Sequence, residues 1–248
     1  MKYLLTYNEK SATKETDKKF EPPKVYSEAE IKKRWDKKRN KIKHLSKNIR
    51  KFKLKVDKDL SSTDEKTKII ATIAKMMEIT GERVGNDGSA QEGRHGISNL
   101  RKKHIKIDGN TITIKYTGKS HVKHEQTFKN AKIAKNLKEL LDKGKQDIFS
   151  TSDGQSIKNT HVNNYLSQFD ITSKDLRGYK ANRLMRDELS KLPKAKDEKE
   201  IKKNFNDTLK KVAGEIQHTP SILRSAYLLP EIENTYYKHG SIGYVKKL

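Results

Sequence analysis

A histidine and a tyrosine near the carboxyl end of the chain have types and spacing suited to chemistry on a phosphate. His218 comes directly before Thr219 and Pro220, and Tyr227 follows about two helical turns later. Thr219 can cap a helix, and proline is favoured at the first helical position. His218 therefore stands beside a predicted helix amino terminus, where backbone N–H groups and the helix dipole attract an anion. Taken alone, the pair favours a simpler interpretation, a loop histidine and an amphipathic surface tyrosine.

Three further basic residues change that balance. Arg83 lies at the end of an Ile- and Met-rich helical pattern, Lys119 lies in a turn between two strand patterns, and Arg177 lies in Lys174-Asp175-Leu176-Arg177. A guanidinium stays charged and can contact two phosphate oxygens at once. Each residue by itself is also explained structurally, as a helix-end cap, a solvated lysine or an ion-pair partner.

Several other kinds of site are excluded or disfavoured. Gly118-Lys119-Ser120 resembles the end of a phosphate-binding P-loop, but Thr113 stands where that motif needs glycine. His121 and His124 have no carboxylate ligand pair nearby, so we interpret them as exposed polar strand positions and assign no metal site. The chain has no cysteine, which excludes disulfides and thiolate chemistry.

The ordered set Arg83, Lys119, Arg177, His218, Tyr227 resembles the catalytic domain of type IB DNA topoisomerases of the small poxvirus and bacterial kind. The resemblance covers most of the chain, from about Tyr26 to Tyr244. It rests on these motifs: Glu82-Arg83-Val84-Gly85-Asn86, Gly96-Ile97-Ser98-Asn99-Leu100-Arg101-Lys102-Lys103-His104-Ile105, Tyr116-Thr117-Gly118-Lys119-Ser120, Lys174-Asp175-Leu176-Arg177, and His218-Thr219-Pro220-Ser221 through Tyr227.

The resemblance implies relaxation of supercoiled DNA through a transient 3′-phosphotyrosyl link, followed by religation. Tyr227 would be the nucleophile. The other residues of the ordered set would bind or protonate the scissile phosphate, with Lys119 as the general acid for the 5′ oxygen. Lys174 and Asn182 would be helpers. The reaction would need no ATP, no cofactor and no metal.

Two departures from the family accompany the resemblance. Ser89 stands six residues after Arg83, where the family usually has tyrosine. Only about 25 residues precede the predicted catalytic domain, so we expect the smaller amino-terminal DNA clamp to be nearly absent and binding to be sensitive to salt.

Two other functions stay open. A tyrosine recombinase or integrase has the same set of residues, but recombinases normally carry His-x-x-Arg at the second arginine, where this chain has Lys174-Asp175-Leu176-Arg177. A non-catalytic basic nucleic-acid binder is the second alternative, in which Tyr227 only stacks or packs.

The elements that position these residues follow an α+β pattern, a mainly helical catalytic domain with a small three-stranded antiparallel sheet. Ser27 and Glu30 form a capping box before one or two basic helices, and the Ser61 to Glu65 segment starts a second, buried helix. Residues 85–96 are expected to be a loop. Strands are predicted around Ile105–Ile107, Ile112–Tyr116 and Lys123–Phe128, and helices over Ala131–Leu141, Thr160–Phe169, Ser173–Leu189, Glu198–Val212 and Pro220–Leu229. The predicted domains are an extended arm or domain remnant over 1–25 and the catalytic domain over 26–248.

The charge of the chain indicates a polyanionic partner. The 248 residues contain 56 Lys and Arg against 32 Asp and Glu, a net charge of +24. Such a basic balance is typical of nucleic-acid binding, so we expect double-stranded DNA as the partner. No apolar run approaches the ~18 residues of a membrane helix. We therefore expect a monomer without membrane contact, inside a cell, in the cytoplasm or nucleoid, or associated with a virus.

Overall fold

The computed structural model describes residues 27–145 and 147–243. The predicted arm over 1–25 lies outside these residues, and so do Tyr26 and Tyr244. The helices are α1 Glu28–Asp59, α2 Glu65–Thr80, α3 Asp87–Gln91, α4 Ala131–Asp142, α5 Asn159–Ser167, α6 Ser173–Ser190, α7 Glu198–Glu215, α8 Pro220–Ile222 and α9 Pro230–His239, and the strands are β1 Ile105–Asp108, β2 Thr111–Thr117 and β3 Lys123–Lys129.

The sequence predicted one or two helices in the first basic segment. The structure has one continuous helix there, α1. It begins at the predicted capping box, where the Ser27 side chain accepts from the Glu30 backbone N–H and Glu30 accepts from the Ser27 backbone. Each reciprocal bond satisfies an orphan donor of the first turn. Its apolar stripe of Ile42, Leu45, Ile49 and Phe52 is buried, whereas Trp35 is 41% exposed.

Helix α2 is largely buried and ends earlier than the sequence suggested. Asp64 caps its amino terminus, and Gly81 ends it in the left-handed conformation with φ of 70°, which glycine adopts without steric cost. The prediction that Arg83 ends this helix is therefore wrong, because Arg83 lies in the extended segment beyond Gly81.

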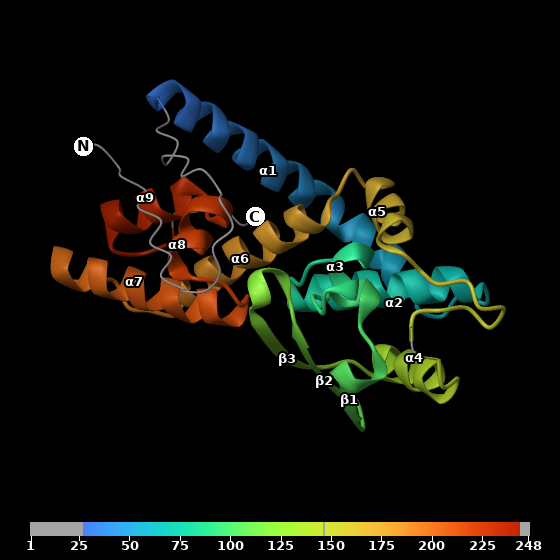
Figure 1. Cartoon of the computed structure of the whole chain (residues 1–248). Coiled ribbons are helices and arrows are strands. Elements are labelled where there is room, and N and C mark those ends of the chain that lie inside the picture. The colour runs from blue at the N-terminus through green and yellow to red at the C-terminus, as the bar shows by residue number, and fades with distance from the viewer. Residues whose placement is uncertain (1–26, 146, 244–248) are drawn as a thin grey trace, which may run out of the picture.

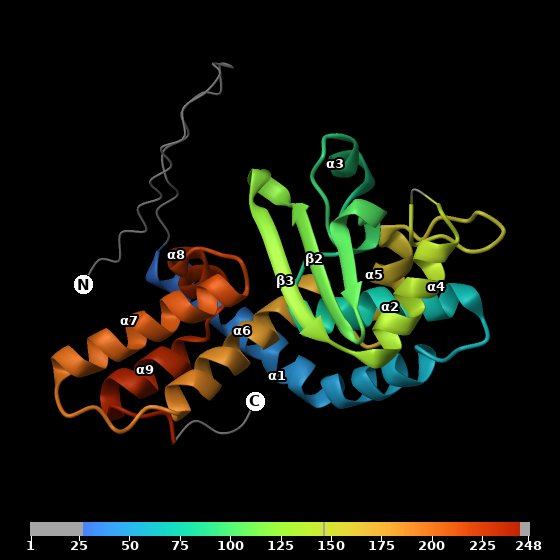
Figure 2. The same cartoon turned by 90° about the horizontal axis from the view of Figure 1, so that it is seen from below.

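The sheet has the predicted antiparallel order β1-β2-β3. Ile105 pairs with Ile114 across the first hairpin, and Tyr116 pairs with His124 across the second. Figure 2 shows the turn between β2 and β3 on the same side of the molecule as α3. The turn that contains Lys119 is a short 3₁₀ segment, Lys119–His121.

Two segments differ from the prediction. Residues 85–96 are not entirely loop, because Asp87–Gln91 form α3, capped by the Asn86 side chain that accepts from the Ser89 backbone N–H. The helix predicted over Pro220–Leu229 is shorter and changes type. It starts as α8 behind its Thr219 cap, continues as a π-helical turn over Leu223–Tyr227, and is followed by the unpredicted helix α9.

The buried apolar side chains fall into two clusters. The first cluster contains residues of α1, α2, the sheet, α4 and α5, and it ends at Leu176. The second cluster contains Ile42, Ala181 and residues of α7, the π-helical turn and α9. Helices α1 and α6 pass from one cluster to the other, as Figure 1 shows. Among the described residues, no helix is long and apolar enough to cross a membrane.

Candidate active site

Arg177 lies on α6 between the two clusters and is 2% exposed. Its Nη2 donates to the backbone oxygen of Ile216, at 2.6 Å, and lies 4.0 Å from Oε2 of Glu82. Glu82 follows α2, whose buried residues form part of the first cluster, and Ile216 belongs to the second cluster. One guanidinium thus contacts both halves of the molecule. Burial lowers its pKa, and the charges of Glu82 and Tyr227 oppose that shift.

The structure brings His218 and Tyr227 together. Their rings stack with centroids 5.4 Å apart at an interplanar angle of 25°. The pKa of His218 is lowered to about 4, chiefly by burial and also by the positive charges of Arg177 and Arg83. His218 is therefore neutral near pH 7 in the free protein. Within the described part of the chain, its Nε2 and the Nε of Arg177 are buried without a hydrogen-bond partner.

The backbone at Tyr227 is held by Asn182, which the resemblance singled out as a helper. Asn182 is fully buried, and its Nδ2 donates to the Tyr227 backbone oxygen at 2.8 Å. Its Oδ1 accepts from the Leu229 backbone N–H at 2.7 Å. These two bonds bracket the end of the π-helical turn. Gly178, one turn earlier on α6, lies next to the tyrosine ring, since a Cβ there would make an ordinary contact of 3.9 Å with Cδ1 of Tyr227.

Arg83 lies in an extended segment that two backbone bonds hold in place. The Arg83 oxygen accepts from Ile97 N–H at 2.9 Å, and the Val84 oxygen accepts from Ser98 N–H at 2.7 Å. The two segments approach so closely at Gly96 that a Cβ there would lie 2.5 Å from the Gly85 backbone. The half-buried Arg83 side chain has no hydrogen bond or ion pair to any described residue. Its guanidinium is therefore available for an anion.

Lys119 and Lys174 are both exposed. Lys119 lies at the hairpin tip, directly after Gly118, and Lys174 lies in the first turn of α6. Arg177 and His218 each lie close enough to Arg83 for its positive charge to lower their pKa values. Among the described residues, neither lysine side chain has a hydrogen bond or ion pair to this group, and the predicted roles of all these residues stay predictions.

Three residues that complete this region were not recognised in the sequence as parts of a site. Glu82 is 2% exposed and accepts from Tyr116 Oη at 2.8 Å and from His124 Nδ1 at 3.0 Å. The prediction that His124 is an exposed strand position is wrong, because it is buried against Tyr116 and Glu82; His121 is exposed, but it lies in the turn. The alternation of more and less buried residues along β2 places Tyr116 on the buried face. This pattern is the one sequence signal that pointed to these three residues.

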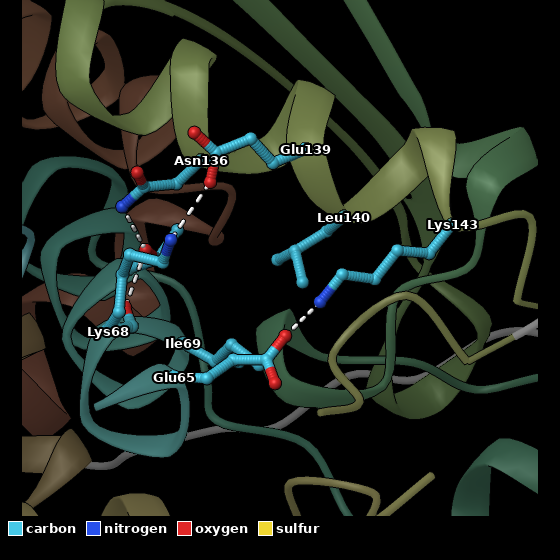
Figure 3. A pocket seen from close by; sticks show the side chains of 8 residues that line it. Glu65, Lys68, Ile69, Asn136, Glu139, Leu140 and Lys143 are labelled. Atoms are coloured by element: carbon cyan, nitrogen blue, oxygen red, sulfur yellow. Dashed lines mark hydrogen bonds and ion pairs between the residues drawn. The ribbon is translucent and has the colours of Figure 1, made fainter. Parts of the chain in front are cut away.

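A cavity between α2 and α4 lies elsewhere. It is lined by Glu65, Lys68, Asn136 and Lys143 among others, and its volume is about 20 Å³. Figure 3 shows the ion pairs Lys68–Glu139 and Lys143–Glu65 across it. The cavity adjoins the amino-terminal part of α2, whereas Arg83 follows the other end of that helix. Because it has room for little more than a water molecule, it is not a substrate site.

Comparisons with known proteins agree on one family. Residues 28–240 match the family described as "Eukaryotic DNA topoisomerase I, catalytic core". The chain is 29% identical over 181 residues to DNA topoisomerase 1B of Acanthamoeba polyphaga mimivirus, covering 66% of this chain and 53% of that protein. It is 32% identical over 145 residues to DNA topoisomerase 1B of Vaccinia virus (strain Copenhagen), covering 55% and 43%. The chain thus spans about half the length of these curated relatives.

Two solved structures of the XerH site-specific recombinase bound to difH substrates are also similar. They share 16% and 14% sequence identity with this chain, at TM-scores of 0.47 and 0.48. They cover 76% and 90% of this chain, and 52% and 55% of their own chains.

Proposed function

Because the chain belongs to the family of the eukaryotic DNA topoisomerase I catalytic core, we propose that it relaxes supercoiled DNA by transient cleavage of one strand. The observation that carries the proposal is a pair of buried, unpartnered nitrogens beside a tyrosine. Arg177 Nε and His218 Nε2 have no partner among the described residues, and His218 stacks on Tyr227. A buried polar group without a partner is costly, and a phosphate oxygen at this place would satisfy both.

In the proposed reaction, the phenolic oxygen of Tyr227 attacks a backbone phosphorus. The new P–O bond links tyrosine to the 3′ end, and the bond from phosphorus to the 5′ oxygen breaks. The phenolic proton is released, and Lys119 supplies a proton to the leaving 5′ oxygen. Religation reverses each transfer, so no bond energy is lost and ATP is not consumed. Torsion in the DNA drives the rotation between the two steps.

The basic side chains stabilise the charge that spreads over the non-bridging oxygens during this transfer. Arg83 and Arg177 supply fixed positive charge, and His218 donates one hydrogen bond. Neutral His218 is suited to this role because one ring nitrogen still carries a proton. Lys174, exposed near Arg177 on α6, would assist proton transfer at the edge of the site.

Double-stranded DNA is the proposed substrate, bound by a single copy of the chain. The net charge of +24 would attract the duplex. The reaction as written needs one copy of each residue, and no group from a second subunit takes part. The named relatives are viral, and we propose that this chain acts on DNA inside infected or host cells.

The deciding experiment is relaxation of a supercoiled plasmid without ATP and in EDTA. The unsubstituted protein should relax the plasmid, and Tyr227→Phe should not. Denaturation during the reaction should trap a covalent protein–DNA adduct only for the unsubstituted protein. Equal relaxation by the Phe variant, or none by either protein across salt concentrations, would refute the proposal. Exchange between specific sites with little relaxation would indicate a recombinase instead.

A further inference from the structure

Glu82 is a buried carboxylate next to the proposed site, and no step of the proposed reaction uses it. It directly precedes Arg83 in the chain. Burial opposes its ionisation, but hydrogen bonding from His124 and the positive charge of Arg177 outweigh burial and hold its pKa below the usual value. Glu82 is therefore an ionised acceptor in the interior. Its two direct hydrogen bonds, 2.8 and 3.0 Å long, both go to the β2–β3 hairpin.

These two bonds reach the hairpin just below its tip. Tyr116 and His124 face each other across the two strands, and their rings stack with centroids 5.0 Å apart at 8°. Only the pair Thr117–Lys123 lies between them and the turn. A Cβ at Gly118 would lie 2.6 Å from His124 Nε2, so the turn rests directly on the histidine ring. Lys119 is the next residue.

We propose that Glu82 is a positioning residue for Lys119: by holding Tyr116 and His124, it fixes the position of the hairpin tip relative to Arg83. This inference rests on the proposed function. A general acid must lie within hydrogen-bond distance of the leaving oxygen, and the Lys119 side chain makes no hydrogen bond or ion pair to a described residue that would place it. Glu82 joins the tip to the segment of Arg83 because it belongs to that segment.

Arg177 is the other group that Glu82 faces, and the distances separate the two relationships. The carboxylate oxygen lies 4.0 Å from Arg177 Nη2, which instead donates to Ile216 at 2.6 Å. Loss of Glu82 would therefore release the hairpin first, while Arg177 keeps its bond to the Ile216 backbone. A test that isolates the general acid from the arginines can tell the two apart.

Such a test compares two duplex substrates that differ in one atom. One has the natural bridging 5′ oxygen at the cleavage site, and the other has sulfur there. A thiolate is a much weaker base than an alkoxide, so the sulfur leaving group departs without a proton donor. The phosphorus, its non-bridging oxygens and Tyr227 are the same in both. A defect that acts through Lys119 should therefore disappear on the sulfur substrate.

Single-turnover cleavage at saturating DNA is measured for Glu82→Ala, Glu82→Gln and Lys119→Ala. We expect Glu82→Ala to slow cleavage of the oxygen substrate at least about tenfold, a part of what a general acid contributes. Glu82→Gln, which keeps one acceptor oxygen, should be slowed at least about threefold. All three variants should cleave the sulfur substrate at a rate within about twofold of the unsubstituted protein.

Glu78→Gln is the matched control. Glu78 is a carboxylate four residues before Glu82 that pairs with Lys53 at 3.0 Å and Lys75 at 2.8 Å, and it has no hydrogen bond or ion pair to a described hairpin residue. It should lower the melting temperature without changing the oxygen-to-sulfur rate ratio. If Glu82→Ala does not fold, Glu82→Gln decides.

Each of the other outcomes overturns one part of the inference or the proposed function. If the Glu82 variants are equally slow on both substrates while Lys119→Ala recovers on sulfur, Glu82 does not act through Lys119. Unchanged rates on oxygen exclude any positioning role. If Lys119→Ala does not recover on sulfur, Lys119 is not the acid, and the inference falls with it. If the unsubstituted protein cleaves neither substrate, the proposed function itself fails.

Discussion

The ring of His218 lies nearly parallel to the ring of Tyr227, with centroids 5.4 Å apart. The two residues come from different local structures, a segment before a helix cap and a π-helical turn. The stacking places the imidazole beside the phenol without a hydrogen bond between them, so His218 Nε2 stays free for a phosphate oxygen.

Tyr227→Phe removes only the phenolic oxygen, the proposed nucleophile. Tyr227 is 7% exposed and its ring packs near Gly178, so the Phe ring keeps the same contacts. We expect covalent adduct formation to be lost completely and the free energy of unfolding to change by less than about 1 kcal/mol. Adduct trapping and urea unfolding measure the two effects. A large loss of unfolding free energy alongside the loss of adduct formation would contradict the expectation that the substitution leaves stability intact.

Asn182→Ala should loosen the backbone that carries Tyr227. Two buried backbone groups, the Tyr227 oxygen and the Leu229 N–H, lose their side-chain partner. We expect a loss of about 2–4 kcal/mol in unfolding free energy and slower cleavage at saturating DNA. Asn159→Ala is the control, because its side chain makes one 3.4 Å bond to Gly85. Equal losses in the two variants would show that Asn182 has no special role.

Gly118→Ala should displace the hairpin tip. The added Cβ would lie 2.6 Å from His124 Nε2, closer than real contacts allow. We expect cleavage of the oxygen substrate to slow about tenfold or more, with DNA affinity nearly unchanged. Gly214→Ala, where a Cβ meets nothing within 4 Å, should leave cleavage unaffected. The measurement is the single-turnover rate, and a normal rate for Gly118→Ala would show that the tip tolerates the shift.

His218 should make the protein less stable in acid. Its folded-state pKa of about 4 lies below the ordinary value of 6.5, so between these values the unfolded chain binds a proton that the folded chain does not. Stability should therefore fall as the pH drops from about 6.5 to about 4, by about 1–3 kcal/mol from this half-buried group. His218→Gln should show a flatter profile in urea unfolding, although His104, whose burial lowers its pKa to about 4, still contributes. Profiles of equal slope would contradict the assignment.

The exposed lysines of α1 should hold the duplex without acting in chemistry. Lys43, Lys47 and Lys51 are exposed on this helix. If each contacts a phosphate, replacing all three with glutamine should reduce the slope of log affinity against log salt by about 0.9 per contact. Cleavage at saturating DNA should stay intact. The matched control replaces Lys129, Lys135 and Lys138, which are exposed on β3 and α4, and an equal effect there would show that only net charge matters.

Local patterns in the sequence were enough for most helices and the hairpins, whereas the grouping of His218 with Tyr227 came from the family resemblance. A cap such as Thr219 and a stripe such as that of α1 act within one element, so the sequence shows them directly. Helix α9 was missed because only Ile232 and Tyr236 are buried along it, which is a weak periodic signal.

The parts that sequence reasoning missed depend on contacts between distant segments. His124 is buried against Glu82, 42 positions away, which accepts a hydrogen bond from its Nδ1, and strand alternation alone does not reveal such a partner. The π-helical turn is likewise held from outside, by Asn182 on α6. Local propensity gives way to tertiary contacts at these two places.

The passage of α1 across both clusters has a mechanical consequence. Arg83 and Lys119 belong to the half with the sheet, and His218 and Tyr227 belong to the other half. A strand that rotates under torsion exerts a torque on whatever grips it. With 32 residues at about 1.5 Å each, α1 is a rod of roughly 48 Å that spans both halves. A rod resists bending and shear between the halves, so in the proposed reaction the groups that would break the strand would stay aligned to rejoin it.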